Sequence, residues 1–130
     1  MTDKKWPEDY PVHIEIPPKN AKEINEKLYR LVENDVPEMS DFLASYKDPL
    51  QKHLVRFEKF KNNPHFYGAS FFKTSEPAQH LIDGSPEKFH SKKVAVGPVE
   101  QKHGVASSGR GEHVSVWFCV DEYPKEFVLV

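Results

Sequence analysis

The sequence contains little cysteine and little arginine. Cys119 is the only cysteine among 130 residues, so an intrachain disulfide, a Cys-x-x-Cys pair and a thiolate-rich zinc site are all excluded. Arginine occurs only at positions 30, 56 and 110, and lysine supplies the rest of the positive charge. Because the planar arginine fork is favoured for bidentate phosphate and base recognition, its scarcity argues against a nucleic-acid partner.

No sign of charge dominates, and no long hydrophobic run is present. The formal net charge is -2 with neutral histidines, so the chain has no strong overall field to attract nucleic acid or an anionic membrane. No stretch has the length and apolarity of a signal peptide or a membrane span. We therefore expect no membrane partner and a reducing cytoplasm as the compartment.

The histidines show no metal-binding spacing. No two of them are four residues apart, and the His-Glu-x-x-His motif does not occur. We expect no metal. The seven histidines stand at positions 13, 53, 65, 80, 90, 103 and 113.

Aromatic residues, in contrast, are plentiful. Nine Phe, five Tyr and two Trp, with 38% hydrophobic residues overall, are enough to build a real core. A chain of this size usually forms one domain, so residues 1–130 are predicted to be a single domain. Its first ten residues are charged and contain proline, which predicts a flexible arm.

Helical signals lie mainly in the first half of the chain. Asn20 stands three residues before Glu23, a variant of the capping box, and Ile24, Leu28 and Leu31 follow at helical spacing. This predicts a helix over residues 21–33, although "KLYRLV" would also suit a strand. The other predicted helices span residues 40–46, 49–61 and 74–84, the last capped by Thr74 or Ser75 and closed by Gly84.

Strand signals lie mainly in the second half. Alternating or aromatic runs predict strands over residues 12–16, 65–73, 93–99, 113–120 and 126–130, with a polar loop over residues 100–112. Because helices mostly precede strands, we expect an α+β fold. Its sheet should be mainly antiparallel with about five strands, accompanied by two to four helices that are mostly N-terminal.

The stretch "SSGRGEHVSVWFCV", residues 107–120, carries the most chemistry. In a strand, Val114, Val116, Phe118 and Val120 share an apolar face that must be core, and His113, Ser115, Trp117 and Cys119 share a mixed face. The mixed face either packs under a helix or lines a cleft. Glycines flank Arg110, and exposed amides beside an arginine could hold an anion, so Arg110 is a ligand-binding candidate.

One short motif in this stretch resembles half of the signature of the two-histidine phosphoesterases. His113 and Ser115 form a His-x-Ser pair on a predicted strand, and the second pair would be His13-Ile14-Glu15, where glutamate replaces the hydroxyl residue. The resemblance implies that His13 and His113 act as acid and base, with Ser115 contacting the phosphate.

A second set of residues resembles the arginine-serine-glutamate ADP-ribosyltransferases. That family places an arginine on an early strand, a serine motif on a middle strand and a glutamate near a late strand; here Arg30, Ser70 and Glu112 follow that order. The resemblance implies that Arg30 and Ser70 hold NAD and that Glu112 stabilises an oxocarbenium-like ribose. Two departures are Arg110, where the family has glutamate or glutamine, and the predicted helix around Arg30.

Two classes of function remain open at this point. The leading hypothesis is a small binding or inhibitor-type module, immunity-like or accessory, which needs no cofactor and contacts a protein partner through exposed aromatic residues and the 100–112 loop. The alternative is a nucleotide-handling enzyme that uses Arg30, Ser70 and Glu112, or less favourably His13 and His113. The sequence fixes neither the partner nor the oligomeric state.

Overall fold

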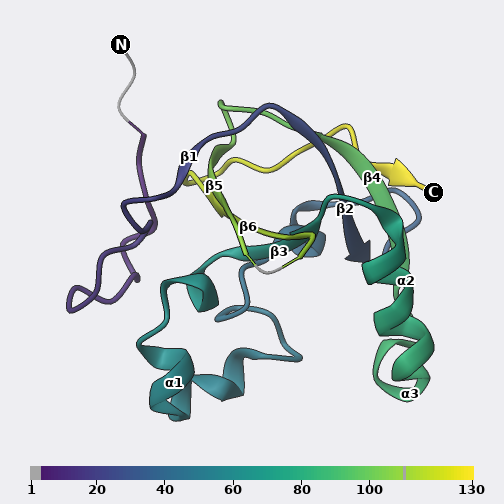
Figure 1. Cartoon of the computed structure of the whole chain (residues 1–130), viewed down its shortest axis with the longest axis horizontal. Helices are drawn as coiled ribbons and strands as arrows, with labels where there is room; N and C mark the ends of the chain where they lie inside the picture. The colour runs from purple at the N-terminus through teal and green to yellow at the C-terminus, as the bar shows by residue number, and fades with distance from the viewer. Residues whose placement is uncertain (1–3, 110) are drawn as a thin grey trace.

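The computed structural model describes residues 4–109 and 111–130, which form a single α+β domain around one antiparallel sheet. The fold class is confirmed, with seven strands in place of about five. Their order in the sheet is β1-β5-β6-β3-β2-β4-β7 (Figure 1). The strands are β1 Lys22–Glu23, β2 Glu26–Val32, β3 Ala69–Phe72, β4 Lys93–Val99, β5 Gly104–Ser108, β6 His113–Phe118 and β7 Val128–Leu129.

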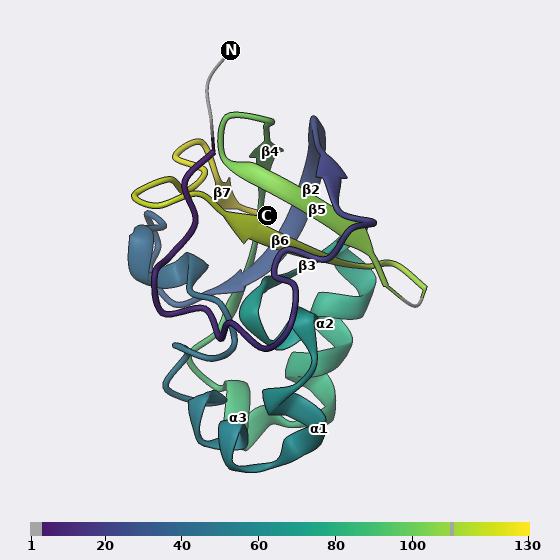
Figure 2. The same cartoon turned by 90° about the vertical axis from the view of Figure 1, so that its left-hand side faces the viewer.

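The helical segments are short and lie between residues 39 and 89. The three α-helices lie below the strands in Figure 2. None of the helices in residues 4–109 and 111–130 is long and apolar enough to cross a membrane. The α-helices are α1 Glu58–Lys61, α2 Ser75–Gly84 and α3 Pro86–Phe89; the 3-10 turns are η1 Met39–Phe42, η2 Lys52–Arg56 and η3 Pro64–Tyr67.

One face of the sheet, the core face, forms the hydrophobic core. Leu28, Phe71 and Val116 on three different strands are fully buried there, as the alternation of β-strand side chains requires. Phe42 and Phe127 pack against this face, and their ring centroids are 5.1 Å apart in an edge-to-face contact. Each such side chain contributes about 1.5–3 kcal/mol by leaving water.

The opposite face of the sheet, the second face, is covered by two different segments. Ala78 of α2 is fully buried, and α2 packs on β2, β3 and β4. Trp117 is fully buried near η3, where its indole N–H donates to the Pro64 carbonyl at 3.0 Å. Gly68 permits this approach, since a Cβ there would lie 3.1 Å from the indole ring. Strand β3 is therefore central and covered on both sides, and Phe66 and Tyr67 are buried rather than exposed to a partner.

The predicted helix over residues 21–33 is wrong, because the segment forms β1 and β2. Leu28, Arg30 and Val32 alternate as buried residues along β2. Because Arg30 is one of these buried residues, the apolar residues alone show no two-residue period. Ile24, Leu28 and Leu31 matched the helical period by coincidence. Arg30 therefore lies on a strand.

Three other predictions needed correction. The predicted strand over residues 12–16 is absent: Val12 is fully exposed, and flanking prolines leave no neighbour strand beside it. The predicted helix over residues 49–61 breaks into η2 and α1. The 100–112 loop contains β5, which pairs with β6 although its small residues give no strand period. The helix over residues 74–84 is confirmed as α2, with Thr74 at its N-cap.

The described part of the N-terminal arm contacts the rest of the chain. The Val120 amide donates to the Lys5 carbonyl at 2.9 Å, and the Tyr46 hydroxyl donates to Asp9 at 2.8 Å. These contacts place residues 5–10 beside the end of β6 and the loop that follows η1.

Candidate functional site

A row of three serines crosses the second face of the sheet. Ser70 on β3 lies opposite Ser115 on β6, and Ser115 lies opposite Ser107 on β5. Ser115 and Ser107 are buried, whereas Ser70 is half-buried. Polar residues aligned across three neighbouring strands are uncommon in a sheet interior, because each buried hydroxyl needs a hydrogen-bond partner.

Two histidines supply partners for this row. The Ser70 hydroxyl hydrogen bonds to His113 Nε2 at 2.6 Å, and the Ser115 hydroxyl to His65 Nδ1 at 2.8 Å. His65 packs on Trp117 with ring centroids 5.2 Å apart, and His113 on Phe72 with centroids 5.7 Å apart. Aromatic neighbours thus fix the orientation of both imidazole rings.

Both imidazoles favour the neutral form. Burial lowers the pKa of His65, and burial together with the nearby charge of His65 lowers the pKa of His113. A neutral imidazole can accept a proton from a hydroxyl, so His113 can act as a base toward Ser70.

Arg30 lies on the core face, one strand away from this cluster. Its guanidinium donates to the carbonyls of Asp41 at 2.7 Å, Ser70 at 2.6 Å and Leu43 at 2.9 Å, and packs over the Phe71 ring. Burial lowers the pKa of Arg30 to about 10, and the Asp48 and Asp41 carboxylates oppose this change. Tyr29 and Phe72 form the one described residue pair between β2 and β3, so backbone pairing between these two strands is short. Arg30 adds a side-chain donor to the Ser70 carbonyl on β3.

Arg30 and Ser70 line the same small cavity. It has a volume of about 240 Å³ and lies between β2, β3, the 48–51 turn and helices α2 and α3. Two lysines on its wall, Lys88 and Lys92, add positive charge, and Asp48 adds one carboxylate. Lys92 is also paired with Glu33 at 3.5 Å. The cavity therefore carries an excess of positive charge.

Glu112 is exposed immediately before β6. Its carboxylate accepts a hydrogen bond from the Thr74 hydroxyl, and its backbone carbonyl accepts one from the Lys73 amide at 2.9 Å. Thr74 stands between the end of β3 and the start of α2. Glu112 is thus joined to the strand that carries Ser70, but it does not line the cavity shared by Arg30 and Ser70.

The structure brings together some of the residues selected from the sequence and separates others. Ser70, His113 and Ser115 form one cluster. Arg30 hydrogen bonds to the backbone carbonyl of Ser70. Glu112 lies directly before β6 and is hydrogen bonded to Thr74. His13 lies apart, exposed and hydrogen bonded to Asn62 at 2.8 Å. Arg110 lies outside the described residues.

Sequence reasoning missed His65, the second histidine of the cluster. The histidines looked scattered because His65 and Ser115 are fifty residues apart and meet only through packing on Trp117. The pairing of the predicted strands 65–73 and 113–120 indicated that Ser70 meets Ser115 and His113, but His65 lies in η3 outside the paired residues, so no signal in the sequence placed it.

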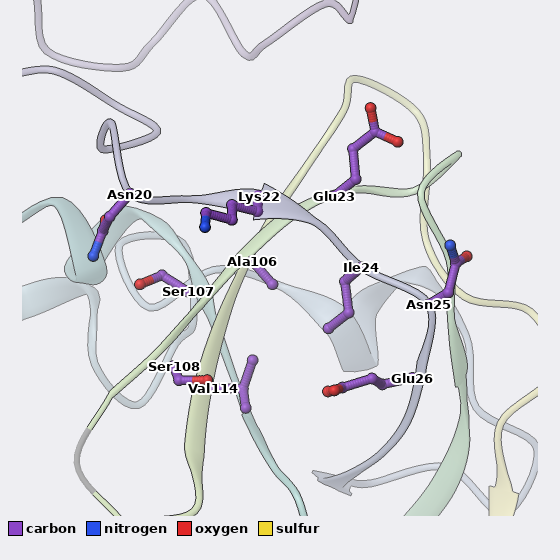
Figure 3. Close-up of a pocket in the computed structure, with 10 residues that line it drawn as sticks. All are labelled: Asn20, Lys22, Glu23, Ile24, Asn25, Glu26, Ala106, Ser107, Ser108 and Val114. Atoms are coloured by element: carbon purple, nitrogen blue, oxygen red, sulfur yellow. The ribbon is translucent and has the colours of Figure 1, made fainter.

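Two larger hollows lie elsewhere. A groove of about 490 Å³ opens where the short edge strand β1 meets β5; Ile24, Ala106 and Val114 form an apolar floor, and Lys22 and Glu26 lie at its sides (Figure 3). Figure 3 shows the Glu23 carboxylate pointing away from this hollow. A second groove, of about 660 Å³, lies beside the N-terminal arm and is lined largely by aromatic rings. We call it the aromatic groove.

Among residues 4–109 and 111–130, no group of three or more histidine, cysteine, aspartate or glutamate side chains is arranged to hold a metal ion. The described site offers hydroxyl, imidazole, guanidinium and carboxylate groups. Comparison with protein-family models, with curated proteins and with solved structures gives no match to this chain.

Proposed function

We propose that this chain transfers ADP-ribose from NAD, as the resemblance to the arginine-serine-glutamate ADP-ribosyltransferases implies. The observation that carries the proposal is strand order. Arg30, Ser70 and Glu112 lie on or directly before β2, β3 and β6, which are consecutive neighbours in the sheet. Arg30 also lies on a strand, which removes one of the two departures from the family pattern.

Arg30 and Ser70 would hold the dinucleotide. A guanidinium carries five N–H donors, and the described bonds use three, so two can face the cavity that Arg30 lines. Lys88 and Lys92 on the same wall would attract the pyrophosphate. The cavity is smaller than a dinucleotide, so only part of NAD would enter it, and the rest would extend toward Glu112.

Glu112 would act on the nicotinamide ribose. The bond between the ribose C1′ and nicotinamide breaks, nicotinamide leaves with the electron pair, and positive charge develops on the ribose. An exposed carboxylate held by Thr74 would stabilise this charge until an acceptor nucleophile, water or a side chain, forms the new bond and loses its proton.

The experiment measures nicotinamide release from NAD by the purified full-length chain. We expect Glu112→Gln to reduce the rate by about 100-fold or more, as for loss of a group that stabilises transition-state charge. Glu87→Gln, an exposed change on α3, should leave the rate unchanged. Wild-type protein that releases no nicotinamide, or a Glu112→Gln variant with the wild-type rate, would refute the proposal.

A second candidate function is a binding module for a protein partner, and the aromatic groove favours it. Seven aromatic residues are among those that line this hollow of about 660 Å³, and aromatic residues are enriched at protein–protein interfaces. The partner surface would be this groove rather than Phe66 and Phe71, which are buried.

The binding proposal can be tested by panning random peptides displayed on phage against the purified chain. Peptides that are enriched on wild type and lost on a Tyr46→Leu variant, with equal melting temperatures, would support it; equal enrichment on both proteins would refute it.

Under either function we propose a reducing cytoplasm, because Cys119 is a free thiol.

A further inference from the structure

The aromatic groove has walls from three separate parts of the chain. The N-terminal arm contributes Trp6 and Tyr10, the segment around η1 contributes Phe42 and Tyr46, and the end of β6 contributes Phe118. The floor reaches Val116, which is fully buried in the core. Val116, Phe42 and Tyr67 lie beneath the surface of the groove, so the aromatic rings that a ligand can reach include those of the half-buried Trp6, Tyr10 and Tyr46.

Three tyrosines form one end of the groove. The ring centroids of Tyr46 and Tyr67 are 5.0 Å apart, and Tyr10 lies 6.0 Å from Tyr46 and 6.3 Å from Tyr67. The Tyr46 hydroxyl donates to Asp9, which fixes that ring relative to the arm. The rings are thereby positioned before any ligand arrives, so binding would cost little conformational entropy.

The groove carries negative charge as well as aromatic faces. Four carboxylates line it, from Glu8, Asp9, Asp121 and Glu122, against two ammonium groups from Lys5 and Lys47. All six side chains are exposed. A positively charged ligand is therefore favoured over a neutral or anionic one at the rim.

The tyrosine faces beside the groove already attract ammonium groups of this chain. Lys47 Nζ lies 5.5 Å from the centroid of Tyr46, and Lys125 Nζ lies 5.4 Å from that of Tyr123, which also lines the groove. These distances are in the range of cation–π attraction, in which the negative ring face stabilises a nearby cation.

We propose that the aromatic groove binds a quaternary ammonium group on a partner protein, in the form of a trimethylated lysine side chain. A quaternary ammonium keeps its charge but has no N–H donors, so ring faces can surround it without leaving a donor unsatisfied. An unmodified lysine is strongly hydrated and would lose more on entering an aromatic site. The groove is much larger than one ammonium group, which leaves room for neighbouring residues of a partner segment.

This inference rests on the second proposed function and is independent of ADP-ribosyl transfer. The probes are three short glycine–serine peptides with one central residue: trimethyllysine, unmodified lysine, or the neutral analogue in which carbon replaces the quaternary nitrogen. Binding to the full chain is followed by NMR through the Trp6 indole and the backbone amides of Tyr46 and Asp121. We expect the trimethyllysine peptide to bind about tenfold more tightly than either of the others.

Variants separate the ring faces from the carboxylates. Tyr46→Phe keeps the ring face and loses only the hydroxyl bond to Asp9, so it should keep most of the affinity, whereas Tyr46→Leu should weaken binding about tenfold. The double variant Asp121→Asn with Glu122→Gln tests the charge if Tyr46→Leu does not fold. Asp121 has a φ of 64°, a conformation that asparagine tolerates, and the double variant should bind a few-fold less tightly at low salt.

The binding results separate the trimethyllysine proposal from the other possible ligands. Equal binding of trimethyllysine and its neutral analogue, or no binding of either, would overturn the proposal. If free choline bound while the trimethyllysine peptide did not, the ligand would be a small molecule and the protein-borne source would be overturned. If neutral peptides were selected by panning while the trimethyllysine peptide failed, the ammonium inference would fail and the binding-module proposal would stand.

Discussion

The two faces of the sheet carry different kinds of side chain on the same strands. On the core face, Leu28, Phe71 and Val116 are fully buried, and the buried guanidinium of Arg30 is held by three backbone carbonyls. On the second face, serines and histidines occupy the corresponding positions of β3 and β6. Apolar packing is concentrated on the core face, and hydrogen-bonded hydroxyl and imidazole groups on the second face.

This contrast predicts unequal effects for neighbouring residues. Phe71→Ala should destabilise the fold by about 3–5 kcal/mol, because it leaves a cavity in the core. Phe72→Ala, one residue later on the second face and only half-buried, should cost clearly less. Urea denaturation of both variants measures the difference, and equal losses would show that the two faces share the stabilising role.

Arg30 is expected to have the next largest effect. Arg30→Lys keeps the charge, but a lysine cannot reach the carbonyls of Asp41, Leu43 and Ser70 together. With one of the three carbonyls left without a donor, stability should fall by about 1–3 kcal/mol. Chemical denaturation that finds Arg30→Lys as stable as wild type would remove Arg30 from the structural account of the core face.

The second face should make stability depend on pH. Because the pKa values of His65 and His113 are lowered in the folded chain, the unfolded chain binds more protons below about pH 6.5. Stability should therefore fall as the pH drops from neutral through this region, until the folded-state pKa values are passed. Urea midpoints measured at several pH values test this.

A histidine-to-asparagine double variant isolates the source of that pH dependence. Replacing His65 and His113 together should flatten the decline, and a smaller slope should remain from His103, whose pKa is also lowered, by burial and by Lys102. An unchanged slope in the double variant would place the pH dependence elsewhere.

Ser70→Ala should have the smallest effect on stability. It removes one hydroxyl partner of His113 and should cost about 1 kcal/mol, the typical net value of a hydrogen bond. Circular dichroism melts provide the measurement. A loss as large as that of Phe71→Ala would show that the serine row is needed for folding.

Part of the fold was predictable because local signals agreed with tertiary packing. Helix α2 has Thr74 at its N-cap and Gly84 at its end, strand β6 has strong apolar alternation, and β4 is a short run rich in valine. Strand β5 was missed because Gly104 and its small neighbours have no period of their own. A Cβ at Gly104 would lie 1.9 Å from the Trp117 carbonyl oxygen, so its place is set by β6.

The site was predictable only where strands pair directly. Ser70, Ser115 and His113 lie on two strands that the sequence suggested, and their register brings them together. His65 could not be placed, because its position depends on how η3 packs against Trp117. The role of Arg30 in holding the 41–43 segment could not be predicted either, because its partners are backbone carbonyls and every residue type carries one.

The most direct test of the central proposal is titration of the isotope-labelled chain with a non-hydrolysable NAD analogue, followed by NMR. The side-chain N–H of Arg30 and the amides of Ser70 and Glu112 should shift along one saturation curve, while signals from the aromatic groove stay unchanged. If these three signals do not move at millimolar analogue, or if only the aromatic groove responds, the strands β2, β3 and β6 do not form a dinucleotide site.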